Sequence, residues 1–258
     1  MTSVPTCCLK AFQWTGTPTG TEGYLPGSSN ATYITGTNPR VAIFLIHDLL
    51  SWKFPNTRLL ADHYAREIDA TVYIPDFFGG ETLPFEPIIQ GRFHEIDIVG
   101  FLGRNSREIR EPEIISFART LRGKYDRVGA IGFCYGGWAV HRLGSKEFFD
   151  SSTGKSELVD CVTAGHPSLL TKSDIDDVRA PVQILAPERD PAYSDEMKLY
   201  SWTTMQKNGV PFDYAHFPGV EHSCFVRGDV NQKGEREAFE RGAKLAVGWA
   251  RMWLHGES

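Results

Sequence analysis

Short apolar runs that alternate with amphipathic segments set the strongest limit on the fold of this chain. Each run is apolar at nearly every position, which is typical of a strand buried on both faces of a sheet. Strands that alternate with helices pair in parallel through right-handed crossovers. We interpret as strands the residues 41–46, 71–75, 128–131, 159–163, 182–186 and 212–216. The sequence therefore predicts an α/β fold with a mostly parallel central sheet and helices on both faces.

The segments between these strands contain residues that begin or end helices. Ser, Thr and Asn side chains cap helix N-termini, Pro suits the first helical turn, and Gly follows the last turn. The predicted helix starts are Asn56 or Thr57, Pro112 and Ser194, with Gly209 ending the third helix and a last helix over residues 235–254. Their apolar residues recur at a spacing near 3.6, so one face of each helix is expected to pack against the sheet.

Two stretches depart from this alternation. The first 40 residues are rich in Gly, Thr and Pro, which predicts loops and a short hairpin. Residues 77–111 form a connection longer than most links between elements, and such connections often serve as lids or substrate loops. A surface excursion with its own short helix is an equal alternative. With 258 residues, the chain is expected to form a single domain over residues 1–258.

Composition excludes several classes of protein. The chain is 41% hydrophobic and 23% charged, which is typical of a globular protein and not of a disordered one. Its net charge of −5 disfavours binding to nucleic acid. No apolar stretch approaches the roughly 20 residues that cross a bilayer, and the N-terminus has no apolar secretory segment. We expect a cytoplasmic protein that binds neither nucleic acid nor a membrane.

The chain contains five cysteines, an odd and low number for its length. They are Cys7, Cys8, Cys134, Cys161 and Cys224. A disulfide framework is not expected, and free thiols fit a reducing compartment. The adjacent Cys7 and Cys8, and Cys224 near His222, lack the paired spacing of zinc ligands. We therefore expect no metal and no cofactor.

A tight turn from strand to helix is predicted at residues 132–137, which read Gly-Phe-Cys-Tyr-Gly-Gly. This is the pattern of a nucleophile elbow, with Cys134 in the place that Ser usually holds. Side chains at Gly132 and Gly136 would collide where the strand and the helix cross. The helix N-terminus would also favour the thiolate of Cys134. The alternative is a buried structural cysteine in a Gly-rich turn.

Two downstream residues supply the acid and the histidine in the chain order of α/β-hydrolases. Asp190 follows the strand at 182–186, and His222 follows the strand at 212–216. Both are therefore expected at the carboxyl ends of the strands, where α/β sheets bind their ligands. Glu188 could replace Asp190. His47 or His166 could replace His222, since each also follows a predicted strand.

With these motifs, the sequence resembles the dienelactone hydrolases, especially the fungal members of that family. The matching segments are residues 48–58, 75–80, 132–137, 166–168, 221–222 and 226–229. The resemblance implies an α/β-hydrolase fold. It also implies a catalytic triad of Cys134, His222 and Asp190.

The resemblance further implies residues around the nucleophile. The backbone N–H groups of Leu49 and Tyr135 would form the oxyanion hole. Family members often place a Glu beside the resting thiol, and the matching residue here is Asp48, which is one methylene shorter. The bacterial enzymes hold a substrate carboxylate with an arginine that we cannot match to a position here, so a dienelactone substrate does not follow.

The expected function is hydrolysis of a lactone or activated ester through a thioester on Cys134. Two alternatives stay open: acyl transfer, cyclisation or rearrangement by the same triad, and a binding protein that has kept the elbow without turnover. The expected partner is a small-molecule ester or lactone, and the protein would be a monomer or a weak homodimer. Candidate residues for an apolar substrate pocket are Trp52, Phe85, Phe93, Phe101, Trp138, His166 and Phe225.

Overall fold

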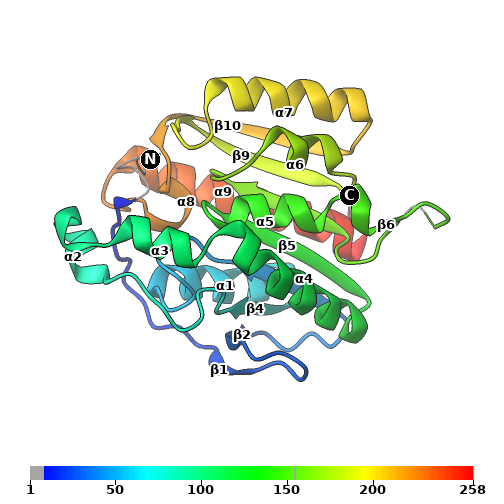
Figure 1. Cartoon of the computed structure of the whole chain (residues 1–258), viewed down its shortest axis with the longest axis horizontal. Coiled ribbons are helices and arrows are strands. Elements are labelled where there is room, and N and C mark those ends of the chain that lie inside the picture. The colour runs from blue at the N-terminus through cyan, green and yellow to red at the C-terminus, as the bar shows by residue number, and fades with distance from the viewer. Residues whose placement is uncertain (1–8, 154, 258) are drawn as a thin grey trace.

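An eight-stranded sheet forms the centre of the computed structural model, which describes residues 9–153 and 155–257 (Figure 1). Its strands are β1 (Thr21–Tyr24), β2 (Ala31–Thr35), β3 (Val41–Ile46), β4 (Thr71–Pro75), β5 (Arg127–Phe133), β8 (Cys161–Gly165), β9 (Val182–Arg189) and β10 (Phe212–Glu221). They lie in the order β1-β2-β4-β3-β5-β8-β9-β10. The pairs β1–β2 and β2–β4 are antiparallel, and the other neighbouring pairs are parallel. The prediction of a mostly parallel sheet is confirmed.

Helices cover both faces of this sheet (Figure 1). One face carries α1 (Pro55–Ile68), α8 (Cys224–Arg227) and α9 (Lys233–His255). The other carries α4 (Arg107–Lys124), α5 (Gly136–Leu143), α6 (Lys172–Asp177) and α7 (Asp195–Asn208). A small antiparallel pair, β6 (Phe149–Asp150) with β7 (Lys155–Ser156), projects beside them and follows a 3-10 turn, η3 (Lys146–Phe148).

The core explains why the strand sequences are apolar throughout. All six residues of β3 are buried, and they alternate between two hydrophobic clusters. Phe44 and Ile46 pack under the helices of one face, and Ile43 and Leu45 pack under those of the other. A strand covered on both faces has no position at which a polar side chain would reach water.

Two predicted helix starts are wrong. Helix α1 begins at Pro55, with Phe54 at the N-cap position, so neither Asn56 nor Thr57 caps it. The buried amide of Asn56 instead joins distant segments: it accepts from the N–H of Trp14 and donates to the carbonyl oxygens of Phe12 and Val226, each at 2.8 Å. A tertiary requirement therefore explains this polar residue.

Helix α4 begins five residues earlier than predicted, at Arg107, and Pro112 lies inside it. Proline there removes the N–H that would bond to the carbonyl of Glu108. Arg107, the first residue of the helix, bonds to Asp174 of α6. The other predicted cap is confirmed, because the hydroxyl of Ser194 accepts from the N–H of Met197 and α7 ends at Gly209 in the left-handed conformation.

The long connection contains three short helices: α2 (Phe85–Ile89), the 3-10 turn η2 (Phe93–Glu95) and α3 (Ile98–Arg104). They lie toward the same end of the molecule as α8 (Figure 1). Residues 77–111 thus contain more regular structure than a single surface helix.

Within residues 9–153 and 155–257, no helix is both long and apolar enough to cross a membrane. Cys134, Cys161 and Cys224 are buried. Cys7 and Cys8, also expected to be free thiols, lie outside the described residues.

Candidate active site

Cys134 lies at the sharp turn between β5 and α5 with a positive φ of 50°, the left-handed region that non-glycine residues rarely adopt. The two flanking glycines make this turn sterically possible. A Cβ at Gly132 would lie 2.2 Å from the carbonyl oxygen of Gly136, and one at Gly136 would lie 2.3 Å from that of Ile46. The predicted collision at both positions is therefore present in the structure.

His222 and Asp190 meet beside this turn. The Nδ1 of His222 lies 2.8 Å from Oδ1 of Asp190, and both side chains are fully buried. The same Asp190 oxygen accepts from the backbone N–H groups of Ala192 and Tyr193, each at 3.0 Å. The strand ends of β9 and β10 thus bring together two residues that are far apart in the sequence.

The protonation of His222 depends on Cys134. Burial lowers the pKa of His222, but the negative charge on Cys134 and the hydrogen bonds to Asp190 and to Cys134 raise it to about 10. The raised pKa therefore favours the protonated imidazole. A cation beside a cysteine sulfur favours the thiolate, which is the nucleophilic form of cysteine.

The competing residues lie elsewhere or make other bonds. Glu188 is exposed, and its carboxylate accepts from the N–H of Gly219. The ring of His47 contacts the carbonyl oxygen of Asp48 through Nδ1 at 2.9 Å. His166 is close to the site, because its Nδ1 accepts from the backbone N–H of Cys134 at 3.1 Å. Burial holds the pKa of His166 well below its usual value, so this ring is neutral.

A buried ion pair lies next to the thiol. The Oδ2 of Asp48 is 2.7 Å from Nε of Arg227, and both side chains are inaccessible to solvent. Burial raises the pKa of Asp48 although Arg227 lowers it, and the negative charge of Cys134 raises it further. Arg227 was not among the predicted site residues. Its position five residues after His222 is the signal that could have found it.

The two residues proposed to supply the oxyanion donors, Leu49 and Tyr135, are both buried. In the described part of the chain, the backbone N–H groups of Leu49 and Tyr135 have no acceptor. The carbonyl of Asp48 accepts from the N–H of Ser51 at 3.1 Å and from the ring of His47. Because this carbonyl and the N–H of Leu49 belong to one planar trans peptide, fixing the first also fixes the direction of the second.

Most of the aromatic pocket candidates pack within the core. Trp52 lies against Arg58 at 4.9 Å, Phe85 against Phe54, Phe101 against Phe78, and Trp138 against Tyr135. Phe93 is half-buried in η2. In the described part of the chain, two of the seven candidates, His166 and Phe225, lie beside His222. Their rings stack with centroids 5.4 Å apart, and His166 lies 4.7 Å from His222.

Metal ligands do not gather at this site. Among the residues that the structure describes, no group of three or more His, Cys, Asp or Glu side chains is placed to hold a metal ion.

The dienelactone hydrolase family model matches residues 30–252 of this chain. The protein named hydrolase tropI of Talaromyces stipitatus is 27% identical to this chain. The match covers 98% of this chain and 99% of that protein. The carboxymethylenebutenolidase homolog of Mus musculus is 34% identical over 40% of each chain.

Solved structures share the fold. A dienelactone hydrolase from Anabaena variabilis matches with a TM-score of 0.62 at 16% identity, covering 92% of this chain and 97% of its own. A hyperthermophilic esterase from Pyrobaculum calidifontis matches with a TM-score of 0.61 at 11% identity, covering 95% of this chain and 88% of its own. At these identities the likeness concerns the fold alone.

Proposed function

This chain belongs to the dienelactone hydrolase family, and we propose that it hydrolyses a lactone or an activated ester through a thioester on Cys134. The observation that supports this most is the position of His222, whose Nδ1 lies 2.8 Å from Oδ1 of Asp190 at the strand ends beside Cys134. The whole-length match to a protein named a hydrolase agrees with it.

In the proposed reaction, the Cys134 thiolate attacks the acyl carbon and the carbonyl electron pair moves to oxygen. The N–H groups of Leu49 and Tyr135 donate to this oxyanion. The carbon–oxygen bond to the leaving group breaks, and His222 gives its proton to the departing oxygen. Water then attacks the thioester, His222 takes a proton from it, and the acid leaves with Cys134 restored.

The nucleophile favours particular substrates. Thiolate is a good leaving group, so a tetrahedral intermediate formed from an amide tends to expel sulfur rather than nitrogen. An enol ester or lactone oxygen departs more readily. We therefore propose esters and lactones, rather than peptides, as the substrate class.

The proposed catalytic thiol bears on where in the cell the protein works. A catalytic cysteine has to stay reduced, which favours the cytoplasm. The mechanism needs no metal or cofactor, and it uses residues of one chain, so a monomer or a weak homodimer would suffice.

Turnover of p-nitrophenyl acetate with and without iodoacetamide tests the proposal. We expect turnover that iodoacetamide abolishes. A burst of one p-nitrophenol per chain without turnover would instead favour acyl transfer to another nucleophile. No release at all, with Cys134 still alkylated, would favour a binding protein.

The pH dependence tests the role of Asp190. Because the pKa of His222 is raised to about 10, kcat/KM is expected to fall as the pH rises through that value and the imidazolium loses its proton. Replacing Asp190 with Asn removes a negative charge, so the imidazole should titrate at lower pH. Its NMR resonances measure this shift. The variant Glu188→Gln, at the exposed alternative acid, should leave the titration where it is, and an unmoved titration in Asp190→Asn would contradict the assignment.

The contact between Nδ1 of His47 and the carbonyl oxygen of Asp48 predicts that His47 helps to orient the oxyanion donor of Leu49. Replacing His47 with Leu removes one of the two hydrogen bonds that hold the peptide carrying the Leu49 N–H and leaves the one from Ser51. We expect kcat to fall by roughly 10–100-fold, somewhat less than the loss of a whole donor, with KM little changed. Steady-state kinetics measures the split. The exposed His216→Leu is the control, and an equal change in KM with unchanged kcat would refute the positioning role.

A further inference from the structure

The end of β8 and the loop that follows it contact both the backbone and the side chain of Cys134. The N–H of Cys134 is shared between the carbonyl of Gly165 and Nδ1 of His166, each at 3.1 Å, and the N–H of Ser168 donates to the carbonyl of Cys134 at 2.9 Å. The hydroxyl oxygen of Ser168 lies 3.4 Å from Sγ of Cys134, within hydrogen-bond range for sulfur. Ser168 is half-buried, whereas Cys134 has no exposed surface.

A thiolate in this position requires hydrogen-bond donors. Moving a charge out of water is costly unless other groups pair and hydrogen-bond with it. His222, whose pKa is raised by its contact with Cys134, supplies one donor. A thiolate has no proton to give, so in the contact with Ser168 the hydroxyl has to be the donor.

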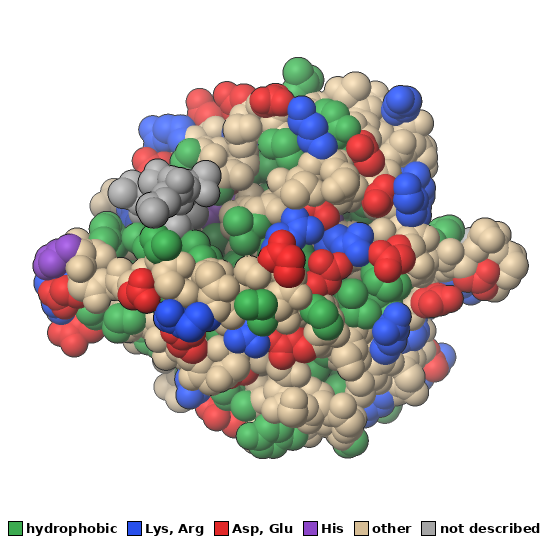
Figure 2. All heavy atoms as spheres, viewed as in Figure 1, with side chains coloured by type: hydrophobic (Ala, Val, Ile, Leu, Met, Phe, Trp, Pro, Cys, Tyr) green, Lys and Arg blue, Asp and Glu red, His purple; other side chains and the backbone are tan. Residues whose placement is uncertain are grey.

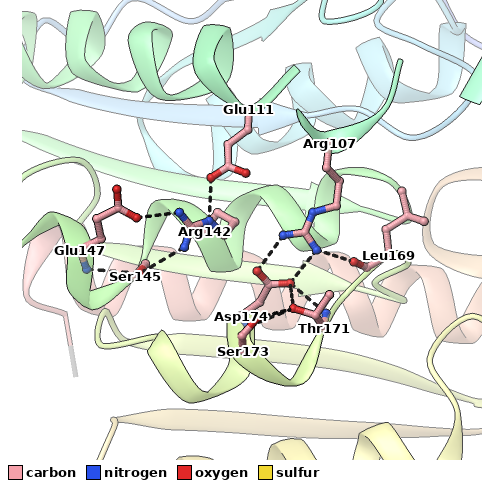
Figure 3. A network of polar contacts seen from close by, with 9 residues as sticks. All are labelled: Arg107, Glu111, Arg142, Ser145, Glu147, Leu169, Thr171, Ser173 and Asp174. Atoms are coloured by element: carbon pink, nitrogen blue, oxygen red, sulfur yellow. Dashed lines mark hydrogen bonds and ion pairs between the residues drawn. The ribbon is translucent and has the colours of Figure 1, made fainter. Parts of the chain in front are cut away.

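The position of Ser168 is held from outside the loop. The residues two before and one after it, His166 and Leu169, both have positive φ, at 37° and 57°. The carbonyl of Leu169 accepts from Nη1 of Arg107 at 2.7 Å (Figure 3). Such strained backbone persists where surrounding contacts hold it.

Besides Leu169, Arg107 contacts two further residues. Its two terminal nitrogens each bond to one oxygen of the buried Asp174 at 2.8 Å, and its guanidinium lies 4.6 Å from the ring of Trp138. Asp174 forms a capping box with Thr171 at the start of α6 (Figure 3). On the face of the molecule that carries α4, α5 and α6, acidic and basic side chains gather over these helices (Figure 2). The contact ties the end of the long connection to the loop beside the nucleophile.

We propose that the Ser168 hydroxyl is a further catalytic group, which donates a hydrogen bond to the Cys134 thiolate, and that Arg107 positions it. This inference rests on the proposed function, because it concerns the same nucleophile. Ser168 would stabilise the thiolate of the resting enzyme together with His222.

A titration of the thiolate by its ultraviolet absorbance tests this. Subtracting the curve of Cys134→Ala isolates the nucleophile from the other cysteines. In Ser168→Ala, we expect the pH at which the thiolate forms to rise by roughly one unit, which corresponds to about 1.4 kcal/mol. Ser168→Thr keeps the hydroxyl and should restore the midpoint. Ser173→Ala removes a nearby exposed hydroxyl and should not move it.

Arg107→Lys tests the positioning role without removing the cation from Asp174. It keeps the charge but loses the two-pronged bond, so the midpoint should rise by less than in Ser168→Ala. Combined with Ser168→Ala it should add nothing, because Arg107 acts through the hydroxyl. Additive shifts would overturn this part of the inference.

The two proposals fail in different ways. If Ser168→Ala leaves the midpoint unchanged while Cys134→Ala abolishes activity, the role of Ser168 is refuted and the proposed function stands. If Cys134→Ala retains full turnover, the proposed function is refuted. If subtraction leaves no thiolate signal in the neutral range, the ion pair and the role of Ser168 are both refuted.

Discussion

Replacing Cys134 with Ala is expected to reduce ester turnover by about 10⁴-fold or more, since losses of this size follow removal of a nucleophile from a catalytic unit. Alanine has no electron pair to attack the acyl carbon, so the thioester cannot form. Steady-state rates with an activated ester measure the loss. Circular dichroism should show an unchanged fold, because the side chain removed is small.

Two further variants sharpen this result. Cys161→Ala removes another buried thiol, on the neighbouring strand β8, and should retain activity. His222→Ala should approach the loss seen in Cys134→Ala, because residues that act as a unit are not additive. Full activity in Cys134→Ala would exclude the thioester mechanism.

Replacing Arg227 with Met is expected to lower the free energy of unfolding by about 3–5 kcal/mol. The substitution leaves the carboxylate of Asp48 without its cation in a site inaccessible to solvent. It also removes the bonds from Arg227 to the hydroxyl of Ser223 at 2.8 Å and to the carbonyl of Lys10 at 3.2 Å. Denaturant unfolding measures the change through its midpoint and slope.

A second substitution separates charge from packing. In the double variant Asp48→Asn with Arg227→Met, no charge is left uncompensated, so much of the stability should return. Arg40→Met is a matched control, because Arg40 pairs with Asp126 at 2.6 Å where both side chains are largely exposed. It should leave the unfolding midpoint unchanged. A loss in Arg227→Met no greater than in Arg40→Met would show that the buried pair contributes little.

Local sequence was sufficient for the strands and for the elbow. The runs at 41–46 and 71–75 coincide with β3 and β4, because a strand between two layers of helices has to be apolar along its length. The turn at Cys134 was predictable because its steric requirement falls on two glycines close in the chain. Chain order then led to Asp190 and His222, which the structure brings together.

Other features depend on contacts between distant residues. Asn56 is of a residue type that often caps helices, yet its side-chain amide bonds to two segments that are remote in the sequence. Helix α4 starts at Arg107, which bonds to Asp174 of α6, although Pro112 locally favours a first turn. No periodicity or spacing connects the partners of these contacts.

The chain's own sequence thus determined the layered α/β architecture and the tight turn at Cys134, because both depend on neighbours within one or two turns of backbone. Only the tertiary structure decided that Arg227 pairs with Asp48 and that Ser168 reaches the sulfur. Burial makes those pairings strong, and burial arises only when the strand ends of the sheet come together.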